Sequence, residues 1–381
     1  MSFRIQTVKN SEDIRAFQRL PFDLHGDNEQ WCPPFREEIE KIFDEKRNER
    51  FRRGGECERF IVLEDGLTIG RFSLFTDPEK DERYDPKLGG MGLLELADKE
   101  GIMGEIIKFA KEWFTMRGYH GFRGPINFGE NDRYWGVQLT GFDSPNVYGM
   151  LTHAPYYESH VESTNPEKFD DLYMYNRKIM DEIPERLKRI TDRLINREGV
   201  EIRPISKKDL ETDGEYIRQI YNTAFSDQVV QEREEEFTGI SRETIRQTIQ
   251  KVKPVLMPET SPIVFIDGEP ASFLVSVPDM NEISVKTGGE LRWWHLPRVL
   301  TIKKKVSRIR PLAFGTVPKH RGKGLEALIW RFGIEQLRIH YPNVKEMEGG
   351  FVSEKNWIMR RSLEALGCTI SKTYRVYKWI F

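Results

Sequence analysis

An internal repeat is the feature that most constrains the fold of this 381-residue chain. Two Asp-Gly pairs, at 65–66 and 267–268, each join two apolar stretches. Such a pair predicts a β-hairpin, because Asp and Gly both tolerate the positive φ of a tight turn. The Asp of each pair precedes a tyrosine in an aromatic stretch, Tyr175 or Tyr377, by the same 110 positions. The pattern predicts two tandem copies of one α/β fold (α+β, with a mixed sheet).

The length of the chain agrees with two domains, each large enough to bury its own core. We expect a first domain at residues 1–176 and a second at 199–381. Residues 177–198 are charged, and their apolar residues, such as Leu187 and Ile190, recur at helical spacing, which predicts a helical connector.

Composition excludes several classes of function. With 59 Lys and Arg against 61 Asp and Glu, the net charge of −2 argues against nucleic acid as a partner. Cys32, Cys57 and Cys368 are scattered, and the seven His show no ligand spacing, so no metal is expected. With neither a signal peptide nor a membrane-spanning apolar run in the sequence, we expect a cytoplasmic monomer or homodimer without a membrane partner.

A basic, Gly-rich turn follows a predicted buried strand in the second half. Residues 319–324 read Lys-His-Arg-Gly-Lys-Gly, and the glycines at 322 and 324 let successive backbone N–H groups converge without a Cβ. The apolar residues after the turn fall on one face of a helix: Leu325, Leu328, Ile329 and Phe332. A Gly-rich turn at a helix N-terminus predicts a phosphate or pyrophosphate site.

Two common phosphate loops do not match this turn. The Walker pattern needs four residues between its glycines and a Lys-Ser/Thr ending, and the dinucleotide pattern needs a third glycine. Lys319–Gly324 instead resembles the signature Arg/Gln-x-x-Gly-x-Gly/Ala of the GCN5-related N-acetyltransferase superfamily, with Lys in the first position. A Gly-rich helix entrance that binds nothing stays open as the alternative.

The resemblance extends through the second half, in the order strand, loop, helix, strand, Asn, helix, Gly, strand. It implies that acetyl-CoA or another acyl-CoA is the co-substrate and that the loop amides hold its pyrophosphate. The residues expected to bind CoA are Thr316, Val317, Lys319, His320, Arg321, Gly322, Lys323, Gly324, Leu325 and Asn356.

The resemblance also implies direct acyl transfer to an amine of a small molecule or peptide. The amine must lose a proton, and Glu348 and Glu354 are the candidate bases. Position 363, where the family often has a Tyr that protonates the leaving thiolate, is Leu363; Tyr377 is a candidate replacement. Solvent exposure for Glu348, helix capping for Glu354 and packing for Tyr377 are equally open.

Two other classes of function stay open. A non-catalytic acyl-CoA sensor or scaffold would explain Leu363 and the absence of a clear base. A transferase that uses an aminoacyl-tRNA donor is the second, against which the intact CoA-type loop and the near-neutral charge argue.

The first copy is expected to be degenerate. The entrance of its corresponding helix contains Asp98 and Glu100, which would repel a pyrophosphate. Glu130, Asn131 and Asp132 lie in a long polar and aromatic segment and are the candidate substrate-binding residues; a well-capped turn is the alternative.

A second basic segment, residues 292–308, precedes the strand that leads into the loop. It could attract the CoA 3′-phosphate or an anionic substrate, but a helix with a solvated basic face is favoured. Membrane association through its Trp and Lys residues is a third possibility.

Overall fold

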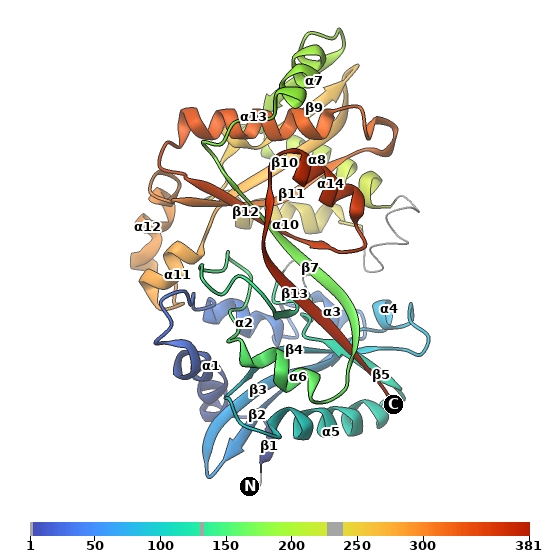
Figure 1. The fold of residues 1–381 in the computed structure, drawn as a ribbon, viewed down its shortest axis with the longest axis vertical. Coiled ribbons are helices and arrows are strands. Elements are labelled where there is room, and N and C mark those ends of the chain that lie inside the picture. The colour runs from blue at the N-terminus through green and yellow to red at the C-terminus, as the bar shows by residue number, and fades with distance from the viewer. Residues whose placement is uncertain (1–2, 130–132, 227–238) are drawn as a thin grey trace. The chain divides into compact units, whose positions relative to one another are not determined.

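The computed structural model describes residues 3–129, 133–226 and 239–381. The chain forms two compact units (Figure 1). Unit 1 comprises residues 1–173, 284–291 and 372–381, and unit 2 comprises residues 174–283 and 292–371. In the described part of the chain, no helix is both long and apolar enough to span a bilayer.

Unit 1 is built from a mixed sheet and the helices of the first half. Its strands are β1 (Arg4–Thr7), β2 (Glu56–Glu64), β3 (Leu67–Thr76), β4 (Gly89–Leu96), β5 (Gly121–Gly124), β6 (Val137–Gln138) and the first part of β7 (Glu167–Lys178). Its helices are α1 (Ser11–His25), α2 (Arg36–Ile42), α3 (Glu49–Arg52), α4 (Pro78–Asp81), α5 (Ile102–Thr115) and α6 (Tyr156–Glu162).

Unit 2 is also built from a mixed sheet and helices, and it repeats the hairpin, strand, helix and strand of unit 1. Its strands are β8 (Val200–Pro204), β9 (Pro262–Ile266), β10 (Glu269–Pro278), β11 (Arg308–Thr316), β12 (Glu346–Ser353) and the second part of β7. Its helices are α7 (Glu185–Ile195), α8 (Leu210–Phe225), α10 (Arg242–Val252), α12 (Leu296–Thr301), α13 (Leu325–His340) and α14 (Trp357–Ala365). Helix α11 (Asn281–Thr287) and strand β13 (Thr369–Ile380) each have residues in both units.

The two predicted hairpins are confirmed. Strands β2 and β3, and strands β9 and β10, pair antiparallel around the Asp-Gly turns. Asp65 and Asp267 have φ values of 49° and 52°, and the following glycines have 81° and 80°. Positive φ at both central residues is the turn geometry that matches the twist of paired strands.

Each unit contains one parallel strand pair that is joined only at its start. Strand β11 pairs with β12 at Arg308 and Ile309, and β4 pairs with β5 at Gly89 and Gly90. Among the described residues, neither pair continues beyond these positions. The strands β4 and β11 also shift register against their antiparallel neighbours, which marks a β-bulge in the same strand of both copies.

The last strand of each half continues into the other unit. Residues Tyr377–Ile380 of β13 pair antiparallel with β5 inside unit 1. In unit 2, the end of β7 lies beside β12, where the Asn176 amide donates a hydrogen bond to Glu346 over 3.0 Å. The C-terminal ten residues therefore complete the sheet of unit 1, whereas the repeat alone predicted a second domain that runs to residue 381.

Candidate functional site

The Gly-rich turn connects β11 with α13 in unit 2. Strand β11 ends at Thr316, residues 318–320 form one 3-10 turn, and α13 begins at Leu325. Gly322 and Gly324 have φ values of 69° and 90°, which side-chain-bearing residues rarely adopt. The two glycines therefore set the path by which the chain enters the helix.

This path leaves backbone donors unused. Among the described residues, no acceptor contacts the N–H groups of Gly322, Gly324 or Leu325. They lie at the N-terminus of a 16-residue helix, where the helix dipole adds positive potential. A Cβ placed on Gly322 would find no atom within 4 Å, so space is open beside these donors. The arrangement suits an anion such as a pyrophosphate.

The side chains of the turn increase its positive charge. The Lys323 ammonium donates to the Lys319 carbonyl over 2.6 Å, and the Arg321 guanidinium donates to the Ala224 carbonyl at the end of α8. Burial, together with Lys319 and Lys323, lowers the pKa of His320. Glu269 offsets part of this charge through a 2.6 Å ion pair with Lys319.

Beside the turn, β11 is paired with a neighbouring strand on one side only, among the described residues. Beyond Ile309 the strand stays paired with β10, across the β-bulge, but within the part of the chain that the structure describes it does not pair with β12. A strand directs alternate N–H groups to opposite sides, so those that point away from β10 face the gap between β11 and β12. A linear ligand that enters this gap could take the place of the missing strand.

Gly324 is needed for packing as well as for the turn. A Cβ there would lie 2.6 Å from Ile190 Cγ2 and 3.1 Å from Leu194 Cδ1, both on α7. We expect Gly324→Ala to destabilise unit 2 by about 2–4 kcal/mol, from positive φ and overpacking together. Gly322→Ala has open space and should cost about 1–2 kcal/mol from backbone strain alone. Urea denaturation measures both losses, and equal losses would contradict the packing role of Gly324.

Glu348 is placed in a buried ion cluster at the start of β12. Its side chain is 1% exposed, and it accepts hydrogen bonds from the Arg308 guanidinium (3.0 Å) and the Ser371 hydroxyl (2.6 Å). Arg308 also binds Asp279, with Nε 2.8 Å from Oδ2. The solvent-facing alternative for Glu348 is therefore wrong, and its carboxylate is already engaged by two donors. From the sequence, Arg308 stands out only as the last residue of the basic segment 292–308. Its place as the first residue of a buried strand was the signal that could have identified it as a buried cation.

The turn between β12 and α14 contains two more predicted residues. Glu354 is partly exposed, and its carbonyl accepts a hydrogen bond from the Arg360 guanidinium over 3.2 Å. The Asn356 side chain caps α14 by accepting from the Met359 N–H over 3.2 Å, which accounts for an Asn at this position without a ligand. Leu363 is buried in α14.

The remaining predicted residues belong to unit 1 or lie outside the described residues. Tyr377 lies in the hydrophobic core of unit 1, where burial and Glu162 raise its pKa well above the usual value, whereas Glu348 and Glu354 belong to unit 2. Residues 130–132, which are Glu130, Asn131 and Asp132, lie outside the described residues. Within the described part of the chain, no group of His, Cys, Asp or Glu is arranged to hold a metal ion.

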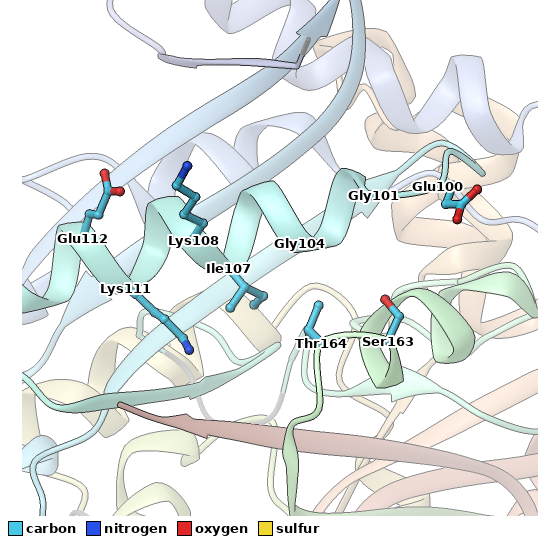
Figure 2. Close-up of a pocket in the computed structure, with 9 residues that line it drawn as sticks. All are labelled: Glu100, Gly101, Gly104, Ile107, Lys108, Lys111, Glu112, Ser163 and Thr164. Carbon is cyan, nitrogen blue, oxygen red and sulfur yellow. The ribbon is translucent and has the colours of Figure 1, made fainter. Parts of the chain in front are cut away.

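Unit 1 has a different entrance at the corresponding helix, α5. Gly101 has a positive φ of 81°, as Gly324 has one of 90° in unit 2, but the preceding loop contains carboxylates. Asp98 accepts a hydrogen bond from the His160 ring over 2.8 Å. Figure 2 shows Glu100 at the start of α5, with Ser163 and Thr164 on a neighbouring segment. These residues and α5 line a groove of about 750 Å³. A carboxylate where a phosphate would bind is electrostatically unfavourable.

The end of β4 in unit 1 contains a buried polar cluster that the sequence analysis missed. Glu95 is 1% exposed and binds the His25 ring at 2.8 Å and the Tyr157 hydroxyl at 2.9 Å. Burial opposes its ionisation, but His25 and Arg71 outweigh this effect and lower the pKa of Glu95 to about 2. His153, nearby on the segment before α6, accepts a hydrogen bond from the Gln138 N–H over 3.2 Å. These contacts tie four separate segments of unit 1 together.

Protonation of His153 should weaken this unit below neutral pH. Burial lowers the pKa of His153 to about 4, so the folded state binds its proton less readily than the unfolded state does. The contribution to stability is full above the unfolded pKa of about 6.5 and is lost as the pH falls towards 4. We expect His153 to contribute a loss of about 2 kcal/mol between pH 7 and pH 5, measured in urea denaturation as the difference between the wild type and His153→Gln at the two pH values. His153→Gln should remove most of this loss, whereas the control His160→Gln should keep it.

Two known proteins are similar to this chain over nearly its whole length. No protein-family model matches the chain. Protein YghO of Escherichia coli is 25% identical over 98% of this chain and 94% of its own length. A bacterial ceramide synthase of Caulobacter vibrioides is 27% identical over 97% of this chain and 96% of its own length.

Two solved structures share the fold over nearly the whole chain. A tandem protein of the GCN5-related N-acetyltransferase type, from the clavulanic acid biosynthesis pathway, superposes with a TM-score of 0.60 at 11% identity. The superposition covers 100% of this chain and 98% of the chain of that protein. A GCN5-related N-acetyltransferase of Sphaerobacter thermophilus gives a TM-score of 0.51 at 14% identity, over 99% of this chain and 95% of its own.

The fold is therefore the tandem form of the GCN5-related N-acetyltransferase fold. The predicted α/β class with two copies of one domain is confirmed.

Proposed function

We propose that this protein is an acyl-CoA-dependent N-acyltransferase whose CoA site is the turn between β11 and α13. The observation that carries the proposal is the set of unused N–H groups at Gly322, Gly324 and Leu325. Two further features support the proposal: the side chains of the turn are basic, and β11 has an unpaired edge towards β12 among the described residues. In this assignment the pyrophosphate binds the turn and the pantetheine arm extends along β11.

The transfer is a direct displacement. The acceptor amine attacks the thioester carbonyl, a C–N bond forms, the C–S bond breaks, and CoA leaves as the thiolate. N–H groups of β11 that face the gap would stabilise the developing oxyanion. Glu354, which is partly exposed, is our preferred base for the amine proton, because Glu348 already accepts from Arg308 and Ser371.

The proton for the departing thiolate has no assigned donor. Leu363 is buried and apolar, and Tyr377 belongs to the core of the other unit. A thiolate is a stable leaving group compared with an alkoxide, so departure without a positioned acid is chemically reasonable. Asn356 remains a proposed contact of the pantetheine arm through its side chain at the start of α14.

The acceptor class is suggested by a relative. A ceramide is the amide of a fatty acid with a long-chain amino alcohol, and the full-length relative from Caulobacter is named a ceramide synthase. We propose a long-chain amine as acceptor and a fatty acyl-CoA as donor. Acetyl transfer to a small-molecule or peptide amine, expected from the sequence resemblance, is the alternative.

The experiment compares donors and acceptors with one purified protein. Acetyl-CoA and palmitoyl-CoA are each offered with sphinganine and with a panel of water-soluble amines and peptides. Thiol release reports turnover, and mass spectrometry identifies the amide. We expect N-palmitoylsphinganine, and turnover that depends on the amine. If the protein binds CoA but transfers an acyl group to no acceptor, the enzyme assignment is overturned. That result would favour a non-catalytic sensor, with which Leu363 in place of the family's Tyr also agrees. Turnover with aminoacyl-tRNA in place of acyl-CoA would overturn the donor assignment.

A further inference from the structure

A basic and aromatic insertion precedes β11 in unit 2. Residues 292–305 contain five Lys and Arg and no Asp or Glu, although the whole chain has a net charge of −2. The segment forms a 3-10 turn at Trp293–His295 and then α12. Figure 1 shows α12 at the edge of its unit, away from α8 and α14. The charge of residues 292–305 is therefore positive, opposite in sign to the net charge of the protein as a whole.

Three large apolar side chains of this insertion are exposed. Trp293 is 78% exposed, Trp294 is 49% exposed and Leu300 is 59% exposed. The segment is nonetheless fixed to the unit, because Ile302 and Val306 are 5% and 1% exposed. The buried apolar residues therefore anchor the insertion to unit 2, and the exposed apolar residues face outward.

The exposed set has the composition of a membrane-interface segment. Trp prefers the boundary between headgroups and acyl chains, and neighbouring Lys and Arg are attracted to anionic headgroups. Lys304 and Lys305 are exposed, and the Arg292 guanidinium lies 5.2 Å from the Trp294 ring centroid. An exposed Trp surface without cations would not select an anionic surface. Here both features occur within fourteen residues.

We propose that residues 292–305 dock the protein peripherally on an anionic lipid bilayer. The sequence favours a solvated basic face without a membrane partner, but the exposure of both tryptophans favours a membrane surface instead. The inference concerns a surface and does not depend on acyl transfer at the CoA turn. If the acceptor is a lipid amine, the same surface would bring the enzyme to its substrate.

The test is co-sedimentation of the full-length protein with vesicles. Phosphatidylcholine vesicles are compared with vesicles of equal parts phosphatidylcholine and phosphatidylglycerol, at low and high salt. We expect binding to the anionic vesicles alone, a blue shift of Trp fluorescence, and release by salt. Trp293→Ala/Trp294→Ala and Lys304→Glu/Lys305→Glu should each lower the partition coefficient at least about tenfold.

Trp357→Ala is the matched control. Trp357 is 46% exposed and also has an arginine near its ring, with the Arg361 guanidinium 5.0 Å from the centroid. We expect its vesicle binding to equal that of the wild type, and circular dichroism checks that every variant is folded. Absence of binding to anionic vesicles, undiminished binding of the folded double variants, or an equal loss in Trp357→Ala would overturn the proposal. Capture of an acidic protein by these residues without any vesicle binding would also overturn it.

Discussion

Gly322→Asp is expected to weaken CoA binding at least about 100-fold, or about 2.7 kcal/mol. The residue lies among the unused N–H groups of the turn, and a Cβ there meets no atom within 4 Å, so the side chain fits. Its carboxylate would occupy the position proposed for the pyrophosphate, and like charges in contact cost several kcal/mol. Calorimetric titration with CoA measures the loss directly.

The control for this variant is Gly322→Asn. Asn has nearly the same shape as Asp and tolerates the φ of 69° equally well, but it has no charge. We expect its CoA affinity to stay within about threefold of the wild type. Equal losses in both variants would mean that the backbone, and not charge at an anion site, governs binding. Unchanged affinity in Gly322→Asp would sink the CoA assignment. Gly324 is unsuitable for this comparison because its substitution also disturbs α7.

Arg308→Met is expected to destabilise unit 2 by about 3–5 kcal/mol. Arg308 neutralises Asp279 and Glu348, and the side chains of all three residues are at most 8% exposed. Removal of the guanidinium leaves two buried carboxylates without their cation, which costs far more than the pair itself contributes. Urea denaturation measures the change in the free energy of unfolding.

Arg246→Met is the control for this second prediction. Arg246 pairs with Glu243 on α10 at 3.9 Å, and both side chains are more than 60% exposed. Solvent screens such a pair, so we expect a loss below about 1 kcal/mol. A similar small loss for Arg308→Met would show that the buried carboxylates are stabilised by other means. It would also remove our reason for preferring Glu354 over Glu348 as the base.

Local patterns predicted the features that depend on local sequence. The Asp-Gly pairs specify hairpins because only a few residue types accept positive φ at both turn positions. The apolar spacing after Gly324 specifies α13, and the glycines specify its entrance. These signals located the repeat and the Gly-rich turn without any information on tertiary contacts.

The same local patterns could not predict contacts between residues that lie far apart in the sequence. Tyr377 reads as the end of the second copy, but its strand completes the sheet of unit 1, because strand pairing does not depend on order in the sequence. Asn356 reads as a ligand contact, but Asn is also one of the residues that a helix N-cap favours. The contact between His25 and Glu95 joins residues 70 positions apart, which no local pattern can link.

The central claim is that acyl-CoA binds unit 2 at the β11–α13 turn and does not bind the acidic entrance of α5 in unit 1. A crystal structure of the protein with CoA tests it most directly. We predict one CoA per chain, with its pyrophosphate on the N–H groups of Gly322, Gly324 and Leu325. Pyrophosphate at Gly101, or CoA bound with its pyrophosphate away from the turn, would contradict the claim.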